Sequence, residues 1–205
     1  MNDSVGCPEF PVWLIGHSPP EAWADILDTP LDPRHPARHS IWTSVADPMQ
    51  DRLYRIKKLR LDTSKLYIRN AFSQRPKPPI THDTTLVPQR VLRDLFKRYN
   101  PKLVLTFSAD AFMVTLWASG ETPHKQFKTT KLLGEEFRSR IGKYDDSKVN
   151  VIPLLHASIA RGKFPEAHRD FVSTYGTTPP NYFNYVGTKL ADLLLEKLPD
   201  KPIWI

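Results

Sequence analysis

The sequence predicts a three-layer α/β/α fold with a four-stranded, mainly parallel sheet, formed by one domain over residues 1–205. Short apolar runs are the first observation, because each is typical of a buried strand: residues 11–16, 64–72, 102–107 and 149–155. Segments of helical periodicity between these runs are the second, since strands that alternate with helices form parallel sheets with right-handed crossovers. A length of 205 residues, 40% of them hydrophobic, suits one core.

Helices are expected where apolar residues recur at helical spacing, in segments 21–27, 89–99, 108–118, 165–175 and 182–198. Ser108 is the expected N-cap of the third of these helices. The apolar face expected in segment 89–99 consists of Val91, Leu92, Leu95 and Phe96. The last helix has an apolar stripe of Val186, Leu190, Leu193 and Leu194.

Segments 41–61 and 119–148 have weaker patterns. The first is expected to be helical in parts, with Pro48 breaking the helix. Its cations are interpreted as a solvated face: Arg52, Arg55, Lys57, Lys58 and Arg60. The second segment is polar and predicts an irregular excursion or a short hairpin.

The charge and the cysteine content limit the class of protein. A formal net charge of +7, from 29 Lys and Arg against 22 Asp and Glu, favours a polyanionic partner. Cys7 is the single cysteine, which excludes an intrachain disulfide and any metal site built from cysteines alone. No run reaches the ~18 apolar residues of a membrane span, and the N-terminus lacks the basic and apolar regions of a secretory signal. We therefore expect a cytoplasmic protein with no membrane partner.

Polar side chains stand at the end of every predicted strand, in the order His17 and Ser18, Asn70, Ser108, and His156 to Ser158. Ligands of parallel sheets bind outside the carboxyl ends of the strands, so we expect these residues to converge on one site. The chain has no Gly-rich dinucleotide fingerprint, no Walker A loop and no Gly-x-Ser-x-Gly elbow. These absences argue against dinucleotide binding, P-loop phosphoryl transfer and α/β-hydrolase chemistry.

The four strand ends, taken in order, resemble motifs of the uracil-DNA glycosylase superfamily. Residues 11–20, PVWLIGHSPP, resemble its first-strand motif, an apolar run into Gly-x-x-Pro, and residues 66–76, LYIRNAFSQRP, its second strand ending in asparagine. Residues 101–118, PKLVLTFSADAFMVTLWA, are similar to the strand and helix that follow, and residues 151–164, VIPLLHASIARGKF, to the final strand with its His-x-Ser loop. Residues 35–42, HPARHSIW, are similar to a His-Pro…Trp segment of the mismatch-specific branch.

This resemblance implies a uracil-DNA glycosylase-like domain that hydrolyses the N-glycosidic bond of uracil in DNA during base-excision repair, as a monomer and without metal or cofactor. Its partner would be single- or double-stranded DNA that contains uracil. The known branches carry a carboxylate or an amide in the first loop, where this chain has His17 and Ser18. We therefore expect these two residues to take part in catalysis, with Asp28 or Asp32 as alternative sources of negative charge.

The same resemblance assigns roles to the strand ends, where a flipped base would be held. Asn70 would pair with O4 and N3–H of uracil, and Phe72 or Trp42 would stack on its ring. His156 would donate to O2 of the departing base. Three residues are expected to contact DNA phosphates: Ser158, Arg161 and Lys163. Ile159 is expected to act as a wedge in the base stack.

Two other functions stay open from the sequence. A non-catalytic DNA-binding protein of the same fold would have lost the first-loop carboxylate and kept a basic groove. A small-nucleotide hydrolase on an α/β sheet is the other possibility, although the sequence offers no carboxylate cluster for the metal that such enzymes usually need.

Overall fold

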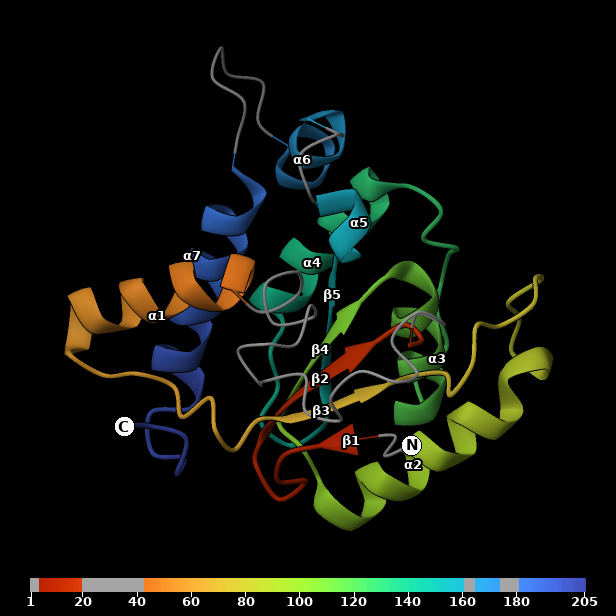
Figure 1. Cartoon of the computed structure of the whole chain (residues 1–205), viewed down its shortest axis with the longest axis horizontal. Coiled ribbons are helices and arrows are strands. Elements are labelled where there is room, and N and C mark those ends of the chain that lie inside the picture. Colours follow the sequence, from red (N-terminus) through yellow and green to blue (C-terminus); the bar gives the residue numbers. More distant parts are fainter. Residues whose placement is uncertain (1–3, 20–42, 161–164, 174–180) are drawn as a thin grey trace.

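A computed structural model describes residues 4–19, 43–160, 165–173 and 181–205 of the chain. Its centre is a five-stranded sheet of order β1-β3-β2-β4-β5, formed by β1 (Ser4–Val5), β2 (Val12–Gly16), β3 (Tyr67–Asn70), β4 (Leu103–Phe107) and β5 (Asn150–Leu154) (Figure 1). The last four strands are parallel to one another, and β1 runs antiparallel beside β3. Every residue of β2, β4 and β5 is buried, as expected of strands that are covered on both faces.

Helices cover both faces of the sheet (Figure 1). On one side α1 (Thr43–Lys57) packs against α7 (Tyr182–Lys197), and α4 (Thr130–Gly142) packs against α6 (Pro165–Val172). On the other side α2 (Leu86–Tyr99) packs against α3 (Ala109–Ser119). The short helix η3 (Asp83–Thr85) precedes α2, and α5 (Ala157–Ala160) follows β5.

The side chains of β2 alternate between two apolar cores. Val12 and Leu14 belong to a core shared with α1, α4 and α7, whereas Trp13 and Ile15 belong to a core shared with α2 and α3. This alternation confirms the predicted arrangement of a mainly parallel sheet between helices. Among the described residues, none of the helices combines the length and the apolar character that crossing a bilayer requires.

The strand β1 is a difference from the prediction, which has four strands and not five. Two residues are too few to show an alternating pattern, and their position follows from pairing with β3, where Ser4 faces Arg69 and Val5 faces Ile68. The other four strands lie within the predicted ranges, with β3 shorter than the run at 64–72. The predicted strand positions are therefore correct, and the predicted strand number is wrong.

Pro48 does not break α1, contrary to the prediction. A proline inside a helix removes one backbone hydrogen bond, but here it lies against α7 at Gly187, where a Cβ would be 2.7 Å from Pro48 Cβ. The missing side chain of Gly187 lets the two helices approach closely. The packing of α1 on α7 thus stabilises a helix that the sequence of α1 alone does not predict.

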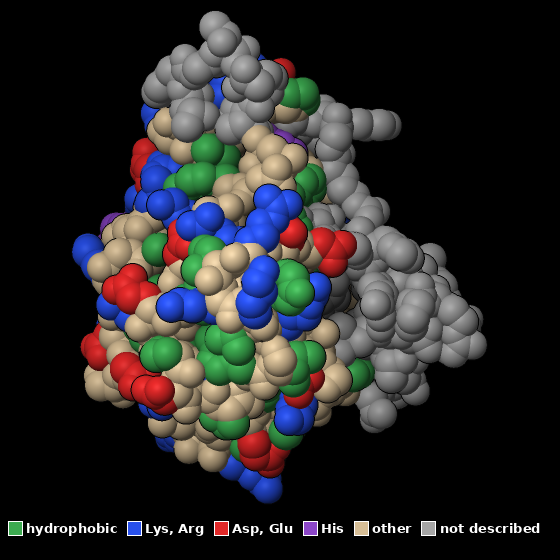
Figure 2. Space-filling model, turned by 90° about the vertical axis from the view of Figure 1, so that its left-hand side faces the viewer, with side chains coloured by type: hydrophobic (Ala, Val, Ile, Leu, Met, Phe, Trp, Pro, Cys, Tyr) green, Lys and Arg blue, Asp and Glu red, His purple; other side chains and the backbone are tan. Residues whose placement is uncertain are grey.

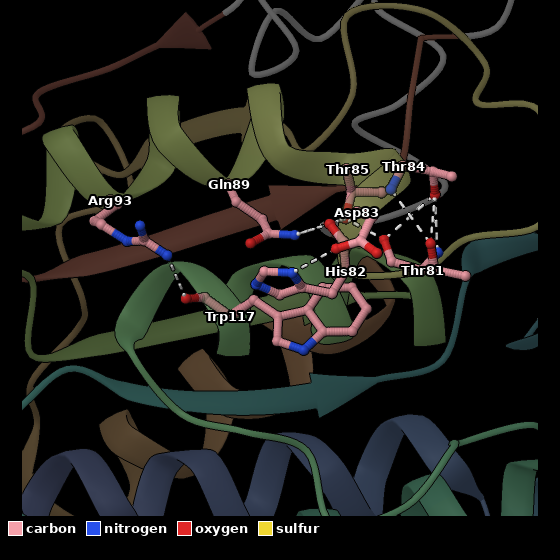
Figure 3. Close-up of polar contacts among 8 residues, drawn as sticks. All are labelled: Thr81, His82, Asp83, Thr84, Thr85, Gln89, Arg93 and Trp117. Atoms are coloured by element: carbon pink, nitrogen blue, oxygen red, sulfur yellow. Dashed lines mark hydrogen bonds and ion pairs between the residues drawn. The ribbon is translucent and has the colours of Figure 1, made fainter.

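The first turn of α2 is organised by the residues before it, so that the helix starts at Leu86 and not at the predicted Gln89 (Figure 3). Thr85 Oγ1 donates to Thr81 O at 2.6 Å. Gln89 Nε2 donates to Thr85 Oγ1 at 2.8 Å and to His82 O at 2.7 Å. These bonds fix the connection between β3 and α2.

The apolar face of α2 also differs from the prediction. Leu92 and Phe96 are buried as predicted, but Val91 is 41% exposed. Gln89 is buried in its place. A polar residue enters the buried face because its amide Nε2 donates to the preceding turn, which the hydrophobic pattern does not reveal. The Gln89 Oε1 is buried and accepts no hydrogen bond from the described residues.

Helix α4 replaces the irregular excursion or hairpin predicted for residues 119–148, which is a correction. Thr129 caps the helix by accepting a hydrogen bond from Leu132 N–H at 3.3 Å. Leu133 and Phe137 are buried four residues apart, as on one face of a helix. Charged residues surround them in the sequence, so the helical pattern of apolar residues is hard to recognise. A single helical turn, α5, likewise stands where the sequence predicts a polar loop after β5.

The remaining helices agree with the prediction. Ser108 caps α3 by accepting from Ala111 N–H at 3.1 Å. The predicted stripe of α7 is fully buried: Val186, Leu190, Leu193 and Leu194. The helix α6 occupies most of the predicted segment 165–175, and the segment 21–27 lies outside the described residues.

Gly187→Ala should destabilise the fold, because a Cβ at this position would lie 2.7 Å from Pro48 Cβ and 2.8 Å from Met49 N. Overpacking of this kind costs about 1–3 kcal/mol. Gly142→Ala is the matched control, since a Cβ there meets nothing within 4 Å and alanine favours a helix by up to about 1 kcal/mol. Denaturant unfolding measures both variants. Equal or higher stability of Gly187→Ala would contradict the close packing of α1 on α7.

Candidate functional site

The carboxyl ends of the four parallel strands lie at one edge of the sheet. β2 stands between β3 and β4, and β5 lies beyond β4. The residues that follow β2 and β5 nevertheless approach each other: the rings of His17 and His156 are 6.4 Å apart between centroids and meet edge to face. The structure thus brings the first and the last of the predicted strand ends together.

Asn70 ends β3 and is paired in register with Gly16, the last residue of β2. The Asn70 side-chain oxygen lies too close to the position of a Cβ at Gly16, so a side chain at this position would force the Asn70 amide to turn away. Backbone hydrogen bonds join the two strand ends, from Ala71 N to Gly16 O at 2.8 Å and from Phe72 N to His17 O at 3.0 Å. No hydrogen bond among the described residues engages the Asn70 amide, so within this part of the chain its donor and acceptor are open to a ligand.

His17 has a polar neighbour at each ring nitrogen. Nδ1 lies 2.9 Å from Ser18 Oγ, and Nε2 lies 3.3 Å from Asp110 Oδ2. Because a carboxylate only accepts, a proton on Nε2 is directed at Asp110, and in the neutral tautomer that carries this proton Nδ1 accepts from the Ser18 hydroxyl. The His17 side chain is 20% exposed and the Asp110 side chain 45%. The three side chains form a continuous chain of carboxylate, imidazole and hydroxyl at the sheet edge.

Asp110 is the site residue that sequence reasoning missed. It lies in the first turn of α3, where the helix dipole favours an acidic side chain. The turn from β4 into α3 is made by Ser108, whose φ of 149° and ψ of 163° lie in a region that residues other than glycine rarely adopt, at a cost of about 1–3 kcal/mol. The available signal was a carboxylate two residues after a predicted strand-end serine.

His156 is held in one tautomer by Ser158. The Ser158 backbone N–H lies 3.3 Å from His156 Nδ1, and Ser158 Oγ lies 2.8 Å from the same nitrogen. Because Nδ1 accepts the backbone proton, the proton of the neutral ring is on Nε2. Burial lowers the pKa of His156, and the nearby His17 lowers this pKa further. His156 is therefore a neutral hydrogen-bond donor through Nε2–H.

The segment that carries His156 is held at both ends by the C-terminal helices. Leu155 N–H donates to the hydroxyl of Tyr182 at 2.9 Å, and burial raises the pKa of this tyrosine so that it stays protonated. His168 Nε2 lies 2.6 Å from Ala160 O. The rings of Tyr182 and His168 are 5.6 Å apart between centroids. These contacts from α6 and α7 fix residues 155–160 against the core.

The other predicted site residues lie around these groups or outside the described part of the chain. Phe72 is only 6% exposed, and its ring centroid is 5.2 Å from that of His17. Ser158 is exposed, whereas Ile159 is half-buried and packs against the larger core. The residues outside the described ranges are Trp42, Arg161, Lys163, Asp28 and Asp32.

The site offers three kinds of group: a donor at His156 Nε2–H, a carboxylate paired with an imidazole at Asp110 and His17, and an amide at Asn70. Such a set can stabilise a departing anion on one side and a developing cation on the other. In the described part of the chain, no three His, Cys, Asp or Glu side chains are grouped so that they could hold a metal ion.

No protein-family model matches the chain, and a comparison with curated protein sequences finds no match.

His156 should titrate below the ordinary histidine pKa of about 6.5, because burial and His17 both disfavour its cation. In the unfolded chain the ring takes up a proton more readily, so His156 lowers stability as the pH falls below about 6.5. NMR of the ring protons against pH measures the shift. In His17→Gln the His156 pKa should rise only in part, since burial is the larger cause. A His156 pKa equal to that in the urea-unfolded chain would contradict this environment.

Proposed function

We propose that this chain is a DNA glycosylase that hydrolyses the N-glycosidic bond of uracil, on a uracil-DNA glycosylase-like fold. The observation that supports the proposal most is a neutral donor beside a carboxylate–imidazole pair: His156 lies next to His17, and His17 is paired with Asp110. Cleavage of the bond produces an anion on the base and a cation on the sugar. The site offers a partner for each of these charges.

His156 is proposed to stabilise the leaving base. As the bond breaks, negative charge develops on uracil O2, and the fixed Nε2–H can donate to it. Preorganised donors of this kind contribute roughly 3–4 kcal/mol in other enzymes. A neutral imidazole fits this role, because it keeps its proton while the base leaves as an anion, which takes a proton from solvent after release.

Asp110 is proposed to supply the negative charge that the first loop lacks. With His17 neutral, the pair carries one negative charge, which attracts the cationic sugar. The Ser18 hydroxyl donates to His17 Nδ1, and its lone pairs can hold the attacking water. When the water oxygen bonds to the sugar carbon, its proton passes to His17, directly or through Ser18, and the resulting imidazolium is stabilised by Asp110.

Asn70 is proposed to select the base. Its amide oxygen would accept from N3–H of uracil, and its amide N–H would donate to O4, whereas cytosine presents the opposite pattern at these two positions. Phe72 lies beside His17 and would line the pocket, with Trp42 as the other candidate for stacking. The chain's net charge of +7 supports a DNA substrate through attraction to phosphates.

A uracil-containing oligonucleotide tests the proposed function directly. The chain is expected to release uracil and leave abasic sites that alkali cleaves, while the matching thymine oligonucleotide stays intact. Single-stranded and duplex substrates are compared under the same conditions. DNA binding without cleavage of any uracil substrate would overturn the proposal and favour a non-catalytic DNA-binding protein.

Single-turnover kinetics should show the largest loss for His156→Ala, about a hundred- to a thousand-fold, from the loss of a leaving-group donor worth roughly 3–4 kcal/mol. Asp110→Asn and His17→Ala should lie between this variant and Ser18→Ala. The serine variant should lose less than about tenfold, because a hydroxyl is a poor base and water can reach His17 without it. His82→Ala, at an exposed histidine, is the matched control. A larger loss in Ser18→Ala than in His156→Ala would contradict this mechanism.

A further inference from the structure

The end of α1 carries cations that no step of the proposed reaction uses. Two of the five cations in this segment are paired with carboxylates: Arg52 Nε lies 2.7 Å from Asp192 Oδ1, and Arg55 Nε lies 3.0 Å from Asp51 Oδ2. The other three are exposed, and their side chains form no ion pair with a carboxylate among the described residues: Lys57, Lys58 and Arg60. On the predicted solvated face, Arg52 and Arg55 are thus neutralised by ion pairs, whereas the three cations that follow them are not neutralised within the described part of the chain.

The aromatic ring of Tyr54 makes cation–π contacts with two of these three cations. Lys58 Nζ is 4.7 Å and Arg60 Cζ 4.9 Å from the centroid of its ring, and Tyr54 is 45% exposed. Lys58 adopts a left-handed backbone conformation with φ of 58°, and its N–H donates to Tyr54 O at 2.9 Å. Arg60 is fixed by reciprocal backbone hydrogen bonds with Ile205, each 2.8 Å long. The cations therefore project from an ordered backbone.

We refer to Tyr54, Lys57, Lys58 and Arg60 as the α1 basic patch. In Figure 1 the last turn of α1 is at the far left, whereas the arrowheads of β2 and β4 point toward the upper right, where the strand-end site lies. Figure 2 looks onto the side of the molecule where α1 ends, and Lys and Arg side chains gather across the middle of this face. The patch and the candidate site are thus on different sides of the protein.

The local structure does not account for this concentration of charge. A cation in the last turn of a helix is favoured by the helix dipole, which explains Lys57, but Lys58 and Arg60 lie beyond the helix. Exposed like charges in adjacent positions repel each other, and binding to a polyanion removes this repulsion. Duplex DNA presents one negative charge per about 1.7 Å of its axis, which matches several neighbouring cations at once.

We propose that the α1 basic patch binds the phosphate backbone of a second DNA segment while the strand-end site engages the first. The assignment of the first segment rests on the proposed function, but the patch would bind DNA whether or not uracil is excised. A protein with two such surfaces bridges two duplexes. It can then transfer between DNA segments without complete release, which shortens a search along DNA for rare bases.

The test uses two uracil-free duplexes, one attached to beads and one labelled with a fluorophore, and measures capture of the labelled duplex by the full chain. The triple variant K57Q/K58Q/R60Q should reduce capture by about tenfold or more. Its slope of log binding constant against log salt concentration should be shallower by roughly 2–3, since each phosphate contact contributes about 0.9 to this slope. The matched control is R90Q/K97Q/R98Q, which removes three exposed cations from α2. The control should keep capture close to that of the unmodified chain.

Three results would overturn the proposal: no capture by the unmodified chain, equal capture by the triple variant, or an equal loss in the α2 control, which would show that net charge alone is responsible. The double variant K57Q/K58Q leaves the Arg60 segment unchanged and replaces the triple variant if that one fails to fold. The rate of uracil excision from a single oligonucleotide is measured in parallel. In the patch variants and in the α2 control it should stay within about twofold of the rate of the unmodified chain, as expected for changes outside the reacting groups. Capture without excision would keep this inference and overturn the proposed function instead.

Discussion

The contact between Gly16 and Asn70 is the constraint on which the rest of the site depends. β2 is the strand between β3 and β4, so the position of every strand-end group is set relative to the end of β2. A side chain at Gly16 would displace the Asn70 amide from this position. Glycine lets this amide lie across the end of β2, and it leaves His17 just beyond the sheet, where it meets α3 at Asp110 and the end of β5 at His156.

The distribution of charge gives the two ends of the molecule different properties. At the strand ends, Asp110 holds a negative charge against His17, and burial lowers the pKa of His156, so both the anion and the cation of the proposed reaction would have a partner. At the end of α1, Lys58 and Arg60 keep positive charges that are not neutralised by carboxylates within the described residues. A basic protein can in this way attract DNA over one surface and retain a carboxylate where the chemistry would occur.

The sequence predicts the parallel strands and their polar ends, because a buried strand is a continuous apolar run and its end is marked by the first polar residues. It does not predict elements whose stability comes from contacts distant in sequence. Pro48 lies inside α1 where Gly187 of α7 leaves room for it, and α4 depends on few apolar positions among many charges. Asp110 was not predicted as a site residue for a related reason. An aspartate in the first turn of a helix is common, and only its short distance to His17 connects it to the site.

The central claim is that the strand-end site recognises a uracil base, and the base specificity of Asn70→Asp tests it most directly. Excision would be measured on oligonucleotides that carry a single uracil or a single cytosine, with Asn100→Asp, at an exposed asparagine, as the matched control. Uracil excision should fall by about a hundredfold or more, with weak excision of cytosine, because the carboxylate no longer offers a donor to O4. The control should keep the specificity of the unmodified chain. Uracil excision at an unchanged rate in Asn70→Asp would contradict the proposed recognition.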